Sequence, residues 1–263
     1  MKRIVFFLIL LELAITCHSA SNWGILDMKS QSLGGLRALS ETSYNPAYWS
    51  FRDKTQVGFA TQNHFQVKEL NTLSGYVLLP NPWLDMGVSV AELGYTDYQQ
   101  WMIHAGFSKK IHSQVAIGAT LRYQSQTGLY DENVQPIIGL DLAMNVQLSP
   151  QIRGAILYEN IAHNTTNAQL PTGMLSAGID YTPLPPCHLF IESASNFRDV
   201  LRLTLGIDYE LMDKFCVRAG CHTQELTPTF GVSFTWNSLT ADVACDRHAN
   251  LGYSVGMGIS YQF

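Results

Sequence analysis

The chain has 263 residues, of which 46% are hydrophobic and 14% charged, and its formal net charge is −5. A mildly acidic chain without basic clusters gives no indication of nucleic-acid binding. After the N-terminus, no apolar run reaches the roughly 20 residues that a membrane-spanning helix needs. The composition therefore excludes helical spans beyond the first residues, and it indicates no cofactor.

Residues 1–20 have the parts of a signal peptide. Lys2 and Arg3 supply positive charge, residues 4–15 are apolar, and residues 18–20 end on small side chains suited to cleavage. Cys17 raises the alternative of a lipoprotein, but Thr16 before it does not fit the small residue that such processing requires. We therefore predict a signal peptide and export across the inner membrane.

Residues 21–52 differ from the rest of the chain because hydrophobic and polar residues alternate only weakly there. The segment contains the glycine pair Gly34-Gly35 and, further on, Pro46 within the run SYNPAYW. Proline has no N–H for a strand ladder and fixes its own φ angle. We predict that residues 21–52 form a plug segment and that the barrel proper comprises residues 53–263.

From residue 53 onward, hydrophobic and polar residues alternate in the manner of strands with two different faces. We count about fourteen strands, at residues 57–59, 65–80, 84–90, 101–107, 115–123, 138–148, 151–161, 175–181, 187–194, 201–211, 215–219, 230–236, 239–243 and 251–263. The patterns at 65–80 and 151–161 are the weakest. An even count places the long connections 125–135 and 162–172 on the outer side, where barrel loops are longer.

The closing stretch 251–263, LGYSVGMGISYQF, has the clearest two-faced pattern. Odd positions from Leu251 to Phe263 are apolar or aromatic, and even positions are Gly, Ser or Gln. An apolar face opposite a face of small polar residues suits a wall with lipid outside and a polar lumen inside. We predict an all-β transmembrane antiparallel barrel in the bacterial outer membrane, in contact with outer-membrane lipid.

Charged residues of the predicted strands fall on the inward parity, because a charge on the lipid face would cost roughly 2–4 kcal/mol near the membrane midplane. The predicted lumen-facing residues are Arg122, Asp141, Asp180, Arg202, Asp208, Glu210, Lys214, Arg218 and Asp242. Both signs are mixed and no ring of one sign appears. We therefore favour ion pairs that fill the interior and brace the plug over an open polar passage.

A glycine-rich start followed by Asn45-Pro46-Ala47, together with the closing strand that ends on Phe263, resembles the FadL-like outer-membrane proteins. Among these the chain looks most like the PorV/PorQ group and the related PorP/SprF group of type IX secretion. The resemblance implies a barrel that serves protein secretion or cell-surface attachment, without catalysis, by binding other secretion or surface proteins. A FadL-like transporter of small hydrophobic molecules is the alternative, and it would require an apolar pocket beside the plug.

An outer-membrane hydrolase is a second alternative. Residues 252–256 match G-x-S-x-G, but that motif needs a strand-to-helix turn and a later histidine, whereas Ser254 falls in a strand and no histidine follows it. Asp246-Arg247-His248 is read as an outer loop, and His104 as a satisfied interior histidine, the single one placed mid-strand on the inward face. The eight histidines show no metal-binding spacing, so we expect no catalytic or metal site.

Two further residue types are assigned to the wall. The four cysteines after the leader, Cys187, Cys216, Cys221 and Cys245, are interpreted as small wall residues whose pairing the sequence leaves open. The aromatic residues are interpreted as the belts that barrels carry at membrane interfaces, namely Trp83, Trp101, Tyr181, Tyr209, Trp236 and Tyr261.

Overall fold

The computed structural model describes residues 24–95, 98–128, 136–163, 173–197 and 201–263. The predicted signal peptide, residues 1–20, lies outside the described residues, as do parts of the predicted outer loops. The helices described are α2 (Met28–Ser32), η1 (Pro46–Phe51) and η2 (Gln224–Leu226). No helix among the described residues is both long enough and apolar enough to cross a membrane.

The strands of the described residues follow one another along the chain. They are β1 (Gln56–Asn63), β2 (Asn71–Leu79), β3 (Asp85–Tyr95), β4 (Tyr98–His112), β5 (Val115–Gly128), β6 (Ile137–Ser149), β7 (Ile152–His163), β8 (Met174–Leu184), β9 (Cys187–Ser195), β10 (Leu201–Met212), β11 (Phe215–His222), β12 (Thr227–Trp236), β13 (Leu239–His248) and β14 (Gly252–Gln262).

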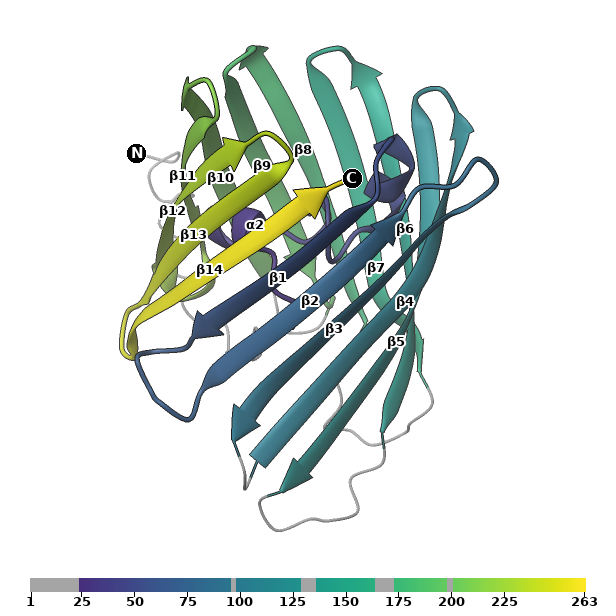
Figure 1. The fold of residues 1–263 in the computed structure, drawn as a ribbon. Helices are drawn as coiled ribbons and strands as arrows, with labels where there is room; N and C mark the ends of the chain where they lie inside the picture. Colours follow the sequence, from purple (N-terminus) through teal and green to yellow (C-terminus); the bar gives the residue numbers. More distant parts are fainter. Residues whose placement is uncertain (1–23, 96–97, 129–135, 164–172, 198–200) are drawn as a thin grey trace, which may run out of the picture.

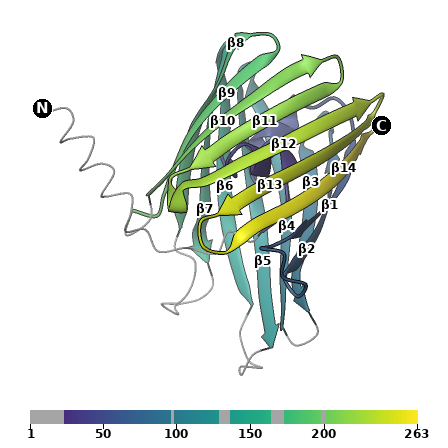
Figure 2. The same cartoon turned by 90° about the vertical axis from the view of Figure 1, so that its left-hand side faces the viewer.

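Each strand pairs antiparallel with its sequence neighbours, and β1 pairs with β14, so the sheet closes into a barrel (Figure 1). The view turned by 90° shows β8–β13 on one side of the ring and β2–β5 on the other (Figure 2). The described part of the chain thus confirms the predicted antiparallel barrel and its fourteen strands. Closure leaves no exposed strand edge, which an open sheet in lipid would have.

The two faces of the wall differ as the sequence predicts. In β10, Leu203 and Leu205 are 46% and 51% exposed, whereas Arg202 and Thr204 are 6% and 2% exposed. The same alternation runs through β14, where Tyr253, Val255, Met257, Ile259 and Tyr261 are exposed. An apolar outer face on a closed barrel requires lipid around it, so the protein belongs in the bacterial outer membrane.

Short turns gather at one barrel end, uppermost in Figure 1, where the C-terminus also lies. There the backbone N–H of Phe263 donates to the carbonyl of Thr55 at 3.0 Å, which brings the chain end beside the start of the barrel. Five of the six predicted belt aromatics are exposed on this half, near the strand ends: Trp83, Tyr181, Tyr209, Trp236 and Tyr261. We assign this end of the barrel to the periplasmic side, because outer-membrane barrels have short turns on the periplasmic side and longer loops on the extracellular side.

The predicted strand at 65–80 is wrong over its first part. Residues 64–70 form the loop between β1 and β2, and β2 starts only at Asn71. Phe65 and Gln66 have φ angles of 58° and 60°, in the left-handed region that ends a strand. The apolar residues Phe65, Val67 and Leu70 gave this loop the appearance of a strand.

The ambiguous pattern at 151–161 has a structural cause. The register between β6 and β7 shifts between Leu140 and Leu142, which marks a β-bulge. At the bulge, Asn160 has a φ angle of 52°, and both Glu159 and Asn160 are buried. Two consecutive residues therefore turn inward, which breaks the two-residue period on which the sequence interpretation depends.

Candidate functional site

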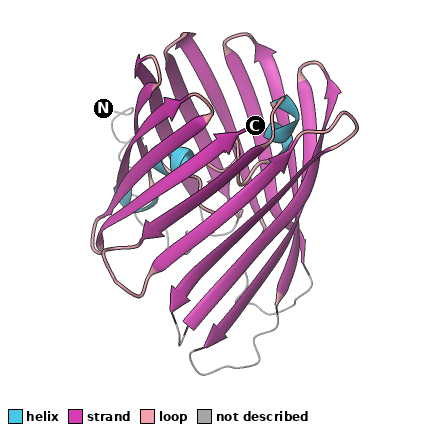
Figure 3. Ribbon diagram, in the orientation of Figure 1, coloured by secondary structure: helices cyan, strands magenta, loops and turns pink. Residues whose placement is uncertain are grey.

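The barrel interior holds the N-terminal segment, which we define as residues 24–55. Helix α2 lies against β11–β14, and η1 lies against β3–β6, so the segment crosses the lumen from one wall to the other. Both helices appear inside the ring of strands (Figure 3). Asp27 caps α2 by accepting from the Ser30 N–H at 3.2 Å.

Asn45, Pro46 and Ala47 form the start of η1. The side-chain oxygen of Asn45 accepts from the Ala47 N–H at 2.9 Å, its amide donates to the Ala38 carbonyl at 2.5 Å, and Pro46 occupies the first helical turn, where no N–H is needed. A Cβ on Gly118 of β5 would lie 2.9 Å from the Ala47 nitrogen. The motif thus fixes a turn that packs directly on the barrel wall.

Several inward glycines receive the segment in the same way. A Cβ built on Gly206 or Gly220 would lie within 3.1 Å of Leu33, and one on Gly178 would lie 2.7 Å from Leu39. The small residues of the inward parity therefore make room for the segment, and their replacement by larger residues would push it out of place.

One buried charge cluster fastens the middle of the segment. Arg37 Nη1 donates to both carboxylate oxygens of Glu159, at 2.9 and 2.8 Å, and Arg122 bridges Glu159 and Asp141 at 2.8 and 2.7 Å. Glu192 accepts from the backbone N–H of Arg37 at 2.8 Å. Because these groups are shielded from water, each charge depends on its partners for stabilisation.

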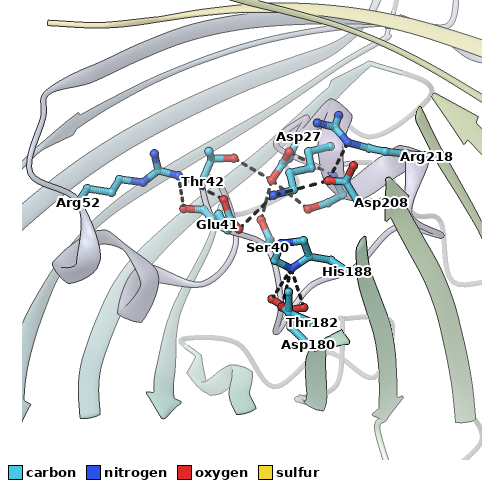
Figure 4. A network of polar contacts seen from close by, with 12 residues as sticks. Asp27, Ser40, Glu41, Thr42, Arg52, Asp180, Thr182, His188, Asp208 and Arg218 are labelled. Atoms are coloured by element: carbon cyan, nitrogen blue, oxygen red, sulfur yellow. Dashed lines mark hydrogen bonds and ion pairs between the residues drawn. The ribbon is translucent and has the colours of Figure 1, made fainter. Parts of the chain in front are cut away.

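A second cluster lies nearer the periplasmic end. Lys29 forms an ion pair with Glu41 at 3.1 Å and approaches Asp208 at 4.0 Å (Figure 4). Arg218 joins this cluster through Asp208 at 3.2 Å and Asp242 at 2.7 Å. The charge of Lys29 lowers the pKa of Glu41 to about 2.

The predicted lumen residues fall into two groups. Those buried inside the barrel are Arg122, Asp141, Asp180, Arg202, Asp208 and Arg218, and Asp242 is partly buried beside them. Arg202 donates to the carbonyl of Gly35 at 2.9 Å, and Asp180 contacts His188 at 3.1 Å. Glu210, near the end of β10, and Lys214, in the turn before β11, are exposed and take no part in the clusters.

Sequence reasoning missed several participants. Glu159 is concealed by the bulge in β7, and Arg37 lies in a segment without a periodic pattern. Glu192 and His188 share the inward parity of β9, so the alternation there could have identified them. His188 lies at the start of β9, whereas His104, predicted to be the histidine placed mid-strand on the inward face, is buried within β4. The four predicted wall cysteines are free.

An outer cavity of about 220 Å³ lies between the N-terminal segment and the wall, toward the extracellular end. Its apolar lining comes from the segment, from the end of β3 and from the loops, namely Leu36, Phe65, Leu70, Leu93 and Leu251. Polar groups, including Gln62, Arg202, His222 and Asp246, complete it. The wall pattern alone could not predict this cavity because most of its apolar residues lie outside the strands.

Asp246, His248 and Ser254, the residues of the two apparent catalytic motifs, line this cavity. Asp246 accepts from the Gln62 amide at 3.0 Å, and His248 Nδ1 accepts from the backbone N–H of Asn250 at 3.1 Å. Ser254 lies within β14 and not at a strand-to-helix turn. In the loop that borders the cavity, burial lowers the pKa of His64, which favours its neutral form.

A periplasmic cavity of about 170 Å³ lies on the other side of α2. Its lining combines the charged residues Lys29, Glu41, Arg52, Arg218 and Asp242 with apolar residues that include Leu26, Met28 and Ala60. The two cavities occupy the two ends of the lumen along the same wall. The intervening residues therefore decide whether the ends communicate.

A closed fourteen-stranded barrel with an apolar outer face and an occupied lumen defines the class of this protein, within the described residues, as an outer-membrane β-barrel. No protein-family model matches the sequence, and no curated protein sequence matches it.

Solved structures do resemble the fold. The monoaromatic hydrocarbon channel CymD matches with a TM-score of 0.73 at 13% identity, over 93% of this chain and 99% of that one. The Pseudomonas putida toluene transporter TodX matches with 0.67 at 12% identity, over 93% and 99%. A FadL homologue from Pseudomonas aeruginosa matches with 0.66 at 11% identity, over 92% and 99%. The fold is therefore FadL-like.

Proposed function

We propose that this protein passes small hydrophobic molecules across the outer membrane, without catalysis. The observation that supports this function best is the outer cavity between the N-terminal segment and the wall, lined by Leu36, Leu93 and Leu251. It lies in a barrel whose fold resembles structures described as hydrocarbon channels and toluene transporters. At the level of sequence this function is the alternative, with an apolar pocket beside the plug as its requirement, and the apolar part of the cavity lining supports it.

The size of the cavity suits a small molecule. At about 220 Å³ it exceeds the roughly 150 Å³ that accepts benzene in an engineered apolar cavity of another protein. Its mixed lining, with Phe65 and Leu70 beside Gln62, provides apolar contact area and a few polar groups, the usual composition of a ligand pocket. A monoaromatic or short aliphatic molecule is the substrate class that fits.

The test is uptake of toluene into proteoliposomes. The wild-type chain should raise uptake above that of empty liposomes. Ser254→Phe should lower it, because Ser254 is 1% exposed and lines the cavity, so the larger ring takes up cavity volume. Ser254→Ala removes the same hydroxyl without adding volume and should leave uptake unchanged. Equal uptake with and without the wild-type protein would contradict the proposal.

A second candidate is the secretion or surface-attachment role implied by the PorV/PorQ-like resemblance. It is favoured by one observation, the firm fastening of the N-terminal segment through Arg37, Glu159 and Glu192. A barrel with this role would bind other proteins through its loops and need pass nothing through its lumen. Pull-down of secretion proteins by the reconstituted barrel, together with absent toluene uptake, would favour this candidate.

A further inference from the structure

The two cavities approach each other along the wall made by β13, β14 and β1. On β14, Ser254 lines the outer cavity, while Gly258 and Ser260 line the periplasmic one. On β13 the corresponding residues are Asp246 and Asp242. A single layer of inward positions therefore separates the two spaces on both strands.

That layer is apolar. Leu26, Met28, Ala60 and Ala244 form a compact hydrophobic cluster, with 2%, 4%, 8% and 5% of their surfaces exposed. Ala244 lies between Asp242 and Asp246 on the inward parity of β13, and it pairs across the strands with Gly256 of β14. On β13 and β14, polar residues flank this cluster, with Asp246 and Ser254 on the outer side and Asp242 and Ser260 on the periplasmic side.

Met28 closes this layer against the wall. A Cβ built on Gly256 would lie 2.7 Å from Met28 Sδ, and one on Gly258 would lie 3.0 Å from Met28 Cγ. The side chain therefore lies flat on two residues that have no side chain of their own. Methionine is unbranched and has three rotatable bonds, so it can change rotamer without moving the backbone of α2.

We propose that Met28 is the gate of the passage between the outer and periplasmic cavities, and that it selects for apolar solutes. The inference deepens the proposed function, on which it rests, by assigning the gating position of the route. A narrow apolar constriction excludes ions, which lose their hydration there, and water, which loses hydrogen bonds. An apolar molecule has no such hydration or hydrogen bonds to lose. Rotation of the thioether away from Gly256 opens the route with the charge clusters still intact.

Ion conductance in planar bilayers tests the gate independently of any substrate. Met28→Ala shortens the side chain over Gly256 and should raise the conductance above that of the wild type. The matched control is Leu39→Ala, a truncation in the same segment at a residue 4% exposed that packs on Gly178 and lines neither cavity. The control should conduct as the wild type does. Equal conductance of the two variants would overturn the proposal.

Toluene uptake supplies the second measurement. We expect Met28→Ala to raise the uptake rate by about tenfold, which corresponds to a barrier lower by about 1.4 kcal/mol. Met28→Cys capped with a benzyl methanethiosulfonate should lower uptake, and reduction of the mixed disulfide should restore it. The wild type treated with the same reagent controls for the native cysteines, which include Cys187, Cys216, Cys221 and Cys245. Capping that leaves the uptake of Met28→Cys unchanged would overturn the proposal.

The two measurements separate this inference from the proposed function. If Met28→Ala conducts more than the wild type, but the wild type takes up no toluene, the gate is supported and the transport function is contradicted. Toluene uptake by the wild type, with the same conductance and uptake in both alanine variants, would support transport and contradict the gate.

Discussion

Glu159 is a buried carboxylate that pairs with two guanidinium groups at once. Its carboxylate accepts from Arg37 at 2.8 Å and from Arg122 at 2.8 Å, and only 2% of the residue is exposed. Arg122 is held in addition by Asp141 at 2.7 Å. The two positive and two negative charges compensate one another only while all four remain.

We predict that Glu159→Gln destabilises the protein by about 3–5 kcal/mol, the usual cost of removing one partner from a buried ion pair. The measurement is the midpoint of denaturant-induced unfolding in detergent, monitored by the loss of the heat-modifiable band on gels. Glu210→Gln, at an exposed strand end, should change the unfolding free energy by no more than about 0.5 kcal/mol. Equal midpoints for the two variants would refute the bracing role of Glu159.

A second residue-scale prediction concerns acid. The pKa of Glu41 is lowered from 4.5 to about 2 by Lys29, so the folded state binds a proton at this site less readily than the unfolded state. Its contribution to stability is complete above pH 4.5 and is lost as the pH falls toward 2. Glu41→Gln should flatten this part of the pH profile of the unfolding midpoint. An unchanged slope between pH 5 and 3 in the variant would show that Glu41 is not responsible.

At the scale of elements, the sequence predicts most clearly those strands in which the two-residue alternation of hydrophobic and polar residues is undisturbed. β14 shows its two faces in the sequence because no register shift interrupts its pairing, and in β10 the register shift between Glu210 and Met212 lies at the end of the strand. β7 does not, because Glu159 and Asn160 both turn inward at its bulge. The loop at 64–70 resembles a strand in the sequence because it contains Phe65, Val67 and Leu70, and the structure places Phe65 and Leu70 in the lining of the outer cavity.

The η1 turn offers an element-scale test. Asn45→Ala removes the cap on the Ala47 N–H and the bond to the Ala38 carbonyl, and we expect it to cost about 1 kcal/mol of stability. Asn81→Ala is the matched control, because Asn81 accepts from the Trp83 N–H at 2.9 Å in an exposed turn. The unfolding midpoints of both variants decide the matter. If Asn81→Ala lowers the unfolding midpoint as much as Asn45→Ala does, the buried cap contributes no more to stability than the exposed one.

At the scale of the whole molecule, the alternation of hydrophobic and polar residues was enough to predict the barrel class and the strand number. It was not enough for the lumen. Arg37 and Glu159 are 122 residues apart, and no local pattern reveals that two such residues meet. The cavities were equally hidden, since their shape depends on how the N-terminal segment lies across the barrel.

The account depends on a lumen closed by the chain's own N-terminal segment. The most direct test is planar-bilayer conductance of the intact protein and of a variant lacking residues 24–52, with folding of both verified by heat-modifiable migration. The account predicts no large steady conductance for the intact protein and a large one for the variant. A large open conductance in the intact protein, or a folded variant that stays closed, would contradict it.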